Sequence, residues 1–192
     1  MPLHLEKKAI RVFALAESFS ETQKFSTMAG VVIRSDLIID GLSLGKLTVS
    51  GSDAARTVLS MFKKLHRNDI NAILASGSVL SLYNVLDIEA VHSATKLPVV
   101  ALSFNRSKSD LAENIRRRFS ARIAEKKIHL LQKLGDPFVL TLKSGYHVFV
   151  RSAGANEAVC QRLLDKFTIQ GAVPEPIRVA RLVARSVAEF NR

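Results

Sequence analysis

The chain has 192 residues and a formal net charge of +11, because 28 lysine and arginine residues outnumber 17 aspartate and glutamate residues. A hydrophobic content of 47% can fill one core, so we expect a single domain over residues 1–192. No run approaches the roughly 18 apolar residues that cross a membrane, and residues 1–8 lack the apolar core of a signal peptide. The single cysteine, Cys160, excludes an internal disulfide and a cysteine-based zinc site. These features predict a cytoplasmic protein without a membrane partner.

The excess of positive charge indicates the class of partner. A basic protein attracts polyanions over long distances, and nucleic acid is the most common of these. An alternative stays open, because many basic proteins of thermophilic or ribosome-rich cells have no specific polyanion partner. We therefore expect nucleic acid, DNA or RNA, as the first candidate partner.

The first third of the chain predicts consecutive strands. Short β-branched, apolar runs occupy residues 10–16, 27–34 and 37–42, and residues 47–50 could add another strand. Ser35 and Asp36 separate two of these runs as a hairpin turn would. We therefore expect an antiparallel meander of three strands.

The rest of the chain alternates helices with strands. Predicted helices cover residues 54–65, 86–95, 110–119, 121–134, 156–167 and 176–190, the first after a possible cap at 51–53 and the last with Pro176 in its first turn. Predicted strands cover 71–75 and 97–102, and residues 138–142 and 146–151 flank the turn residues Lys143, Ser144 and Gly145 as a hairpin.

This order favours one α/β architecture. A meander followed by parallel crossovers predicts a mixed sheet, with parallel strands after the antiparallel ones and helices on both faces. An RNase H-like layout fits that order. A doubly wound nucleotide-binding fold fits less well, because it would alternate strand and helix from the start.

Familiar catalytic motifs give little support for an enzyme. The chain has neither a dinucleotide-binding nor a P-loop glycine pattern. Residues 41–45 match Gly-x-Ser-x-Gly around Ser43, but that motif needs a strand running directly into a helix. Here residues 46–50 continue as strand, so we interpret the glycines as part of a glycine-relaxed strand or a bulge. The five histidines show no spacing typical of a metal site.

Two basic segments are candidate phosphate contacts. Residues 105–133 hold nine basic residues against three acidic ones, which supplies +6 of the net charge. Within the two segments the candidates for nucleic-acid binding are Arg116, Arg117, Arg118, Arg122, Lys126, Arg178, Arg181 and Arg185. The last three follow helical spacing and would form one stripe. The alternative is that both segments are ordinary solvated helix faces.

Five segments carry a resemblance to a known family. They are residues 10–17 (IRVFALAE), 49–54 (VSGSDA), 77–88, which include YNVLDI, 95–100 (TKLPVV) and 173–180 (VPEPIRVA). Together, in this order and over most of the chain, they resemble a family of uncharacterised archaeal proteins related to endonuclease V. The Pro-Glu-Pro-x-Arg-x-Ala and Asn-Val-x-Asp-Ile segments are the most specific. The resemblance implies an RNase H-like fold.

The resemblance also implies where a catalytic site would lie. Endonuclease V cuts nucleic acid near deaminated bases with a divalent metal held by carboxylates, two from strand ends and one before the first helix. Here Ala16 and Ser76 stand at the two strand-end positions, and Asp53 stands near the third. Glu17 follows Ala16, but successive strand side chains point to opposite faces, so we expect it to point away. One carboxylate binds Mg²⁺ weakly.

We therefore expect a substituted active site with no cofactor, and no metal site beyond a weak one at Asp53. The leading hypothesis is a non-catalytic protein that binds nucleic acid through its basic helices. The first alternative is a protein-interaction or regulatory module that uses the altered cleft. The second is a residual metal-dependent nuclease or phosphoesterase, in which case Mg²⁺ would be the cofactor.

Overall fold

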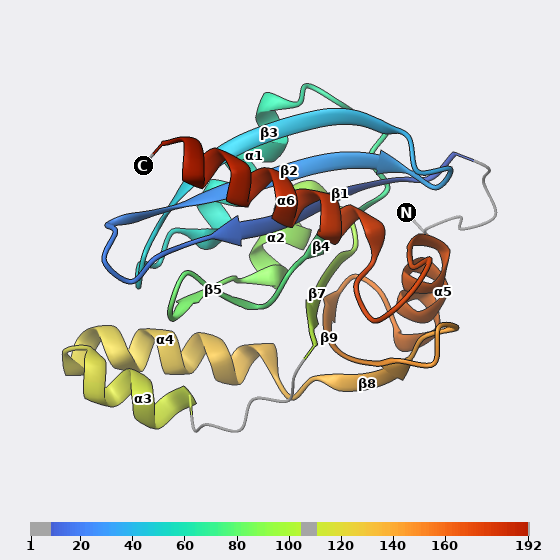
Figure 1. Cartoon of the computed structure of the whole chain (residues 1–192). Helices are drawn as coiled ribbons and strands as arrows, with labels where there is room; N and C mark the ends of the chain where they lie inside the picture. The colour runs from blue at the N-terminus through green and yellow to red at the C-terminus, as the bar shows by residue number, and fades with distance from the viewer. Residues whose placement is uncertain (1–8, 105–110, 192) are drawn as a thin grey trace.

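The fold is a mixed seven-stranded sheet with helices on both faces (Figure 1). The computed structural model describes residues 9–104 and 111–191. The sheet has the order β3-β2-β1-β4-β7-β9-β8, and β5 and β6 form a separate small hairpin. The strands are β1 (Arg11–Ser18), β2 (Phe25–Arg34), β3 (Ile39–Thr48), β4 (Ala72–Ala75), β5 (Val79–Leu80), β6 (Asn84–Val85), β7 (Val99–Ser103), β8 (Phe138–Thr141) and β9 (His147–Ala153). The helices are α1 (Ala54–Lys64), α2 (Ile88–Thr95), α3 (Leu111–Arg118), α4 (Ala121–Leu134), α5 (Glu157–Phe167) and α6 (Glu175–Phe190).

The strand directions confirm the expected mixed sheet. Strands β1, β2 and β3 form an antiparallel meander, β4 lies parallel to β1, and β7 lies parallel to β4. The late hairpin β8–β9 joins the same sheet, with β9 antiparallel to β7. The carboxyl ends of β1, β4 and β7 therefore meet at one edge, which is the edge that holds Ala16 and Ser76.

The expected break between residues 37–42 and 47–50 is wrong, because both belong to the single strand β3. Its glycines permit close packing instead of ending the strand. A Cβ at Gly45 would lie 2.6 Å from the Met61 Sδ atom on α1, so a larger residue here would force the Met61 side chain to shift. Ser43 is buried in the middle of β3 and donates a hydrogen bond to the Met61 carbonyl oxygen at 3.1 Å. The Gly-x-Ser-x-Gly match is thus a feature of strand packing.

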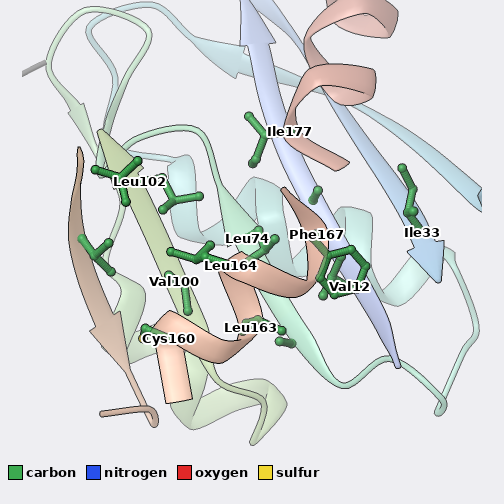
Figure 2. Packing of buried hydrophobic residues seen from close by; sticks show 14 of the residues in the cluster. Val12, Ile33, Leu74, Val100, Leu102, Cys160, Leu163, Leu164, Phe167 and Ile177 are labelled. Carbon is green, nitrogen blue, oxygen red and sulfur yellow. The ribbon is translucent and has the colours of Figure 1, made fainter. Parts of the chain in front are cut away.

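Alternate residues of β1 pack into two hydrophobic cores. Val12, Ala14 and Ala16 face one core, which is closed by α5 and α6. Phe13 and Leu15 face the other, which is closed by α1 and α2. Figure 2 shows the first core, in which α5 side chains such as Leu163, Leu164 and Phe167 meet Val12, Leu74 and Val100 of the sheet.

Helices α3 and α4 form a hairpin beside the main sheet (Figure 1). Their own small core is built from Ile115, Ala124 and Ile128. The buried Lys127 attaches this hairpin to the rest of the fold, because its Nζ donates hydrogen bonds to the carbonyl oxygens of Gly51 and Tyr83. The basic helix pair is therefore fixed close to the carboxyl end of the sheet.

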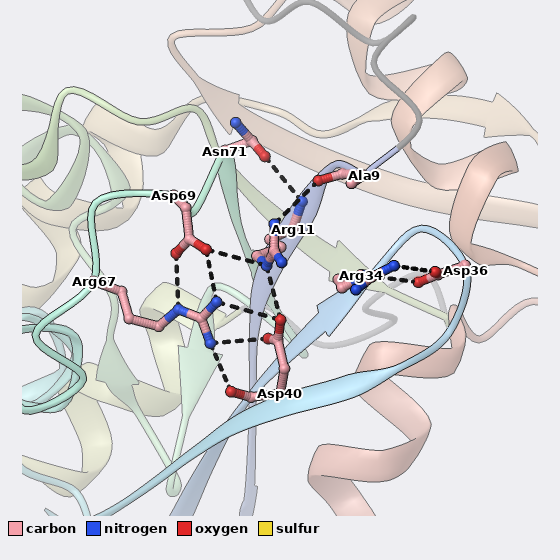
Figure 3. Close-up of polar contacts among 8 residues, drawn as sticks. All are labelled: Ala9, Arg11, Arg34, Asp36, Asp40, Arg67, Asp69 and Asn71. Atoms are coloured by element: carbon pink, nitrogen blue, oxygen red, sulfur yellow. Dashed lines mark hydrogen bonds and ion pairs between the residues drawn. The ribbon is translucent and has the colours of Figure 1, made fainter.

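An ion-pair network ties the opposite end of the sheet together (Figure 3). The Arg67 guanidinium donates to Asp69 at 2.7 Å and to the Asp40 carboxylate at 3.0 Å. Arg11 Nε at the start of β1 lies 2.8 Å from the same Asp40 carboxylate and 3.2 Å from Asp69. The network thus links β1, β3 and the segment that leads into β4, far along the strands from the carboxyl end.

Candidate functional site

Ala16 and Ser76 are neighbours at the carboxyl ends of β1 and β4. Leu15 pairs with Ala75 in parallel register, and the Ser76 N–H donates to the Leu15 carbonyl oxygen at 2.9 Å. Ala16 is only 1% exposed and belongs to the core under α6. Its methyl group offers no ligand, so of this pair only the Ser76 hydroxyl can make a polar contact.

Arg181 of α6 makes that contact. Its Nε and Nη2 atoms donate to the Ser76 Oγ at 3.1 and 2.7 Å. The guanidinium carbon lies 4.6 Å from the centre of the Phe104 ring, which follows β7. Burial, and secondly the nearby charge of Arg178, lower the pKa of Arg181. A half-buried guanidinium therefore occupies the place beside the two substituted positions.

Glu17 lies on the other face of the sheet from Ala16, as strand alternation predicts. Its carboxylate accepts hydrogen bonds from the Ser81 N–H, the Ser81 hydroxyl and, at 3.3 Å, the Ser26 hydroxyl. Burial raises the pKa of Glu17 and outweighs these hydrogen bonds, which act to lower it. The carboxylate is thus held by the β5–β6 segment and does not face α6.

Asp53 has a structural role in this arrangement. It occupies the N-cap position of α1, yet its side chain makes no cap hydrogen bond. Instead it accepts from Thr48 Oγ1 at 2.7 Å and from Asn84 Nδ2 at 2.6 Å. Burial would raise the pKa of Asp53, but the hydrogen bonds from Thr48 and Asn84 lower it overall. This carboxylate joins the end of β3 to β6, and both its oxygens have donors.

A cleft opens next to Ser76, at the ends of β4 and β7. Its volume is about 750 Å³, and its lining includes Gly77, Ser78, Ser103, Leu111, Pro137, Phe149 and Arg151. The Arg151 guanidinium donates to the Ser78 Oγ at 3.2 Å and to the Gly135 carbonyl oxygen at 2.8 Å. Burial lowers the pKa of Arg151, although the charge of Asp136 acts in the opposite direction. Arginines from two different elements thus hold the two serines on either side of Gly77.

Some of the predicted basic residues form ion pairs with neighbouring carboxylates, and others have no ion pair among the described residues. Arg117 forms an ion pair with Glu113, Arg116 lies 4.0 Å from Glu125, and Arg178 lies 3.2 Å from Glu175. Arg118, Arg122, Lys126 and Arg185 are exposed. Arg106 and Lys108, which belong to the predicted basic run, lie outside the described residues. Arg118, Arg122 and Lys126 on the α3–α4 hairpin and Arg185 on α6 are therefore exposed cations without an ion pair among the described residues.

Residues 9–104 and 111–191 contain no group of three or more His, Cys, Asp or Glu side chains placed to hold a metal ion. Within the same ranges, no helix is long and apolar enough to cross a bilayer. Ala16, Ser76 and Arg181 could not hold a divalent metal, because they supply one neutral oxygen and a positive charge. The donor set at this edge therefore suits an anion better than a cation.

Three members of this site are not evident from the sequence. Phe104 and Arg151 lie in or beside strands and carry no motif, and Lys127 looks like one more surface cation in a basic run. Only the helical periodicity of α4 indicates that Lys127 is buried. Lys127 follows Ala124 by three residues, a spacing that places both side chains on the buried face of the helix.

Comparison with known proteins gives the family. The sequence profile of the endonuclease dU family matches residues 8–188. A UPF0215 protein from Pyrobaculum calidifontis is 34% identical over 177 residues, which cover 92% of this chain and 96% of that protein.

Two solved structures share the fold. A protein of unknown function from Archaeoglobus fulgidus superposes with a TM-score of 0.77 at 22% identity, covering 93% of this chain and 98% of that one. Endonuclease V from Ciona intestinalis, solved in complex with a 24mer DNA that contains an inosine followed by a ribo-adenosine, gives a TM-score of 0.63 at 11% identity. It covers 96% of this chain and 88% of that chain. The mixed sheet is therefore RNase H-like, as in endonuclease V, and the chain belongs to the endonuclease dU family.

Proposed function

We propose that this chain is a non-catalytic member of the endonuclease dU family that binds nucleic acid. The observation that carries the proposal is the Arg181 guanidinium on the Ser76 hydroxyl, beside the Ala16 methyl group. In a metal-dependent nuclease, carboxylates position a metal that activates water and stabilises the leaving oxygen. Alanine and serine cannot do this, and a neighbouring guanidinium repels a divalent cation. The family's name describes a nuclease, whereas the residues of this chain support binding without cleavage.

The exposed cations supply the binding surface. Arg118, Arg122 and Lys126 project from the α3–α4 hairpin, which Lys127 fixes to the carboxyl end of the sheet. Phosphate contacts of this kind give affinity without sequence preference, and each one releases condensed counterions. The solved endonuclease V complex with DNA supports the idea that an RNase H-like sheet of this shape can accommodate a nucleic acid.

The cleft beside Ser76 is suited to an unpaired base. Its volume of about 750 Å³ exceeds that of a nucleobase, and its lining combines the Phe149 ring with the polar groups of Ser78 and Arg151. Proteins that read single bases commonly pair an aromatic face with a few hydrogen-bonding groups. We expect Phe149→Ala to weaken binding to single-stranded more than to fully paired oligonucleotides.

The proposal is tested by fluorescence anisotropy of labelled single- and double-stranded DNA and RNA over a salt series. We expect binding whose logarithm falls steeply with the logarithm of salt concentration, by about 0.9 per phosphate neutralised on duplex DNA. Charge reversal of Arg122 and Lys126 to glutamate should weaken binding at least tenfold and reduce that slope. These positions test the surface better than Arg117, which is paired with Glu113.

A matched control separates a local contact from a general charge effect. Lys63 and Lys64 are exposed at the end of α1, so reversing both to glutamate changes the net charge by the same amount elsewhere. Equal losses from the two double variants would mean that only net charge matters. No binding at low salt by the unmodified chain would contradict the proposal, and the protein-interaction module would become the leading hypothesis.

A further inference from the structure

The charge of Arg181 is the least expected feature of the carboxyl edge. The side chain is half-buried, and none of the ion pairs among the described residues involves it. Its hydrogen bonds go to a neutral oxygen, that of Ser76. Withdrawing a charge from water is costly unless an opposite charge or several hydrogen bonds compensate for it. In the described part of the chain, no carboxylate provides that compensation.

The geometry leaves one side of the guanidinium free for a ligand. Nε and Nη2 are used by Ser76, and the Phe104 ring lies against the guanidinium group. Within the described residues Nη1 donates no hydrogen bond, and it is not among the buried atoms that lack a partner. A planar guanidinium that is fixed on one edge and stacked on a ring is ready to bind an oxyanion through the remaining donors.

The surroundings also favour an anion. Burial, and secondly the positive charge of Arg178, lower the pKa of Arg181, so both burial and a like charge disfavour the bare cation. Beyond Gly77, Arg151 holds Ser78 in the same way that Arg181 holds Ser76. Positive charge therefore flanks the segment after β4 from α6 and from β9.

We propose that Arg181, Ser76 and Phe104 form a metal-independent binding site for a phosphodiester group of nucleic acid. The guanidinium lies beside Ala16 and Ser76. If both residues were acids, a divalent metal bound there would contact the phosphate. In this chain the guanidinium contacts the phosphate directly. This inference rests on the proposed function. It adds that the bound group is a phosphodiester, that Arg181 binds it, and that this binding needs no metal. Arg181 is a binding residue here, and no bond of the phosphodiester is broken.

The test is nucleic-acid binding by the full chain, measured by anisotropy with excess Mg²⁺ and with excess EDTA. We expect affinity in Mg²⁺ to be no higher than in EDTA, because Mg²⁺ acts at this site only as a counterion that competes for the phosphates. Arg181→Gln keeps a donor for Ser76 but removes the charge, and it should weaken binding about tenfold, which corresponds to about 1.4 kcal/mol. Arg181→Lys should restore part of the loss, because lysine keeps the charge but not the planar fork. Arg56→Gln, at an exposed arginine of α1 outside the proposed site, makes the same change of charge and should change affinity by less than about threefold.

Ser76→Asp provides an independent variant. Its carboxylate would pair with Arg181 and neutralise it, so we expect weaker binding than with Ser76→Asn, in Mg²⁺ and in EDTA alike. Thermal melting by circular dichroism identifies variants that have lost the fold, and the Gln and Asn variants are chosen to preserve the packing.

The outcomes separate the two proposals. Unchanged affinity of Arg181→Gln, with loss of binding in the Arg122 and Lys126 double reversal, would overturn this site and leave the proposed function standing. Stronger binding of the unmodified chain in Mg²⁺ than in EDTA would overturn metal independence. Absence of any binding by the unmodified chain would overturn the proposed function itself.

Discussion

At the scale of single residues, the carboxyl edge shows how one sheet gives neighbouring side chains different roles. Ala16 and Glu17 follow each other in β1, yet one lies in the core under α6 and the other binds Ser81 on the opposite face. Ser76 and Asp53 are both polar, but Ser76 faces Arg181 while Asp53 joins Thr48 to Asn84. The carboxylates of Glu17 and Asp53 are therefore both engaged in hydrogen bonds within the fold.

A structural role for Glu17 gives a stability prediction. Glu17→Ala leaves the buried Ser81 N–H without its acceptor and should lower the free energy of unfolding by about 1–3 kcal/mol. Glu17→Gln retains an oxygen for that N–H and avoids a buried charge, so at neutral pH its stability should equal or exceed that of the unmodified chain. Thermal or urea denaturation of both variants measures this.

The stability difference between Glu17→Gln and the unmodified chain should also change with pH in a definite direction. Burial raises the pKa of Glu17, so the stability contributed by its protonation is present below about pH 4.5, the ordinary glutamate value, and is lost as pH rises through the folded-state pKa. The advantage of Glu17→Gln should therefore grow from acid to neutral pH. An advantage that instead shrinks as pH rises would contradict the buried, hydrogen-bonded placement of this carboxylate.

At the scale of elements, the ends of the strands are held by different interactions. The carboxyl edge uses hydrogen bonds from Arg181 of α6 and Arg151 of β9 to the serines that follow β4. The start of β1 is held instead by the ion-pair network of Arg11, Asp40, Arg67 and Asp69 (Figure 3). Partly exposed pairs of this type are worth little singly, and a network of several contributes more. The network stabilises the β1–β3 meander without touching the candidate site.

Removing one member of the network should affect stability but not binding. The Arg67 hydrogen bond lowers the pKa of Asp69, so the stabilisation it provides is present above about pH 4 and is lost as pH falls through the folded-state pKa. Asp69→Asn should lower stability at neutral pH by less than about 1 kcal/mol, because solvent screens this partly exposed pair. The deficit should vanish in acid. Glu21→Gln, an exposed control of equal charge change, should change the free energy of unfolding at neutral pH by less than about 0.5 kcal/mol. Loss of nucleic-acid affinity in Asp69→Asn would contradict the independence of the ion-pair network from the candidate site.

At the scale of the whole molecule, the sequence predicts the architecture better than the site. Periodicity identifies the meander, the parallel strands and helix α4 with its bounds, because these patterns are local. It wrongly divides β3, since a glycine that admits Met61 looks the same as one that ends a strand. Helical spacing puts Arg178, Arg181 and Arg185 on one stripe, yet they have three different environments. The environment of each arginine depends on its partners in the fold. Helical spacing cannot identify the partner of Arg181, because Ser76 is 105 positions away in the chain.

The net charge of +11 should affect how fast the whole molecule associates with a polyanion. Long-range attraction to a polyanion raises the rate of association and is screened by salt. We expect the association rate constant, measured by stopped-flow fluorescence, to fall with ionic strength much more steeply than the dissociation rate constant rises. A dissociation rate constant that carries most of the salt dependence would show that the charges act only in close contacts.

The most direct test of binding without cleavage is a denaturing-gel assay on labelled DNA containing deoxyuridine. The chain is present in excess over the DNA, at a concentration that saturates it in anisotropy, with Mg²⁺ or Mn²⁺. We expect the DNA to remain intact while bound, because Ala16 and Ser76 supply no carboxylate and the Arg181 guanidinium beside Ser76 would repel a divalent cation. Cleavage by the purified chain that disappears in Asp53→Ala would contradict this account and would identify Asp53 as part of an active metal site.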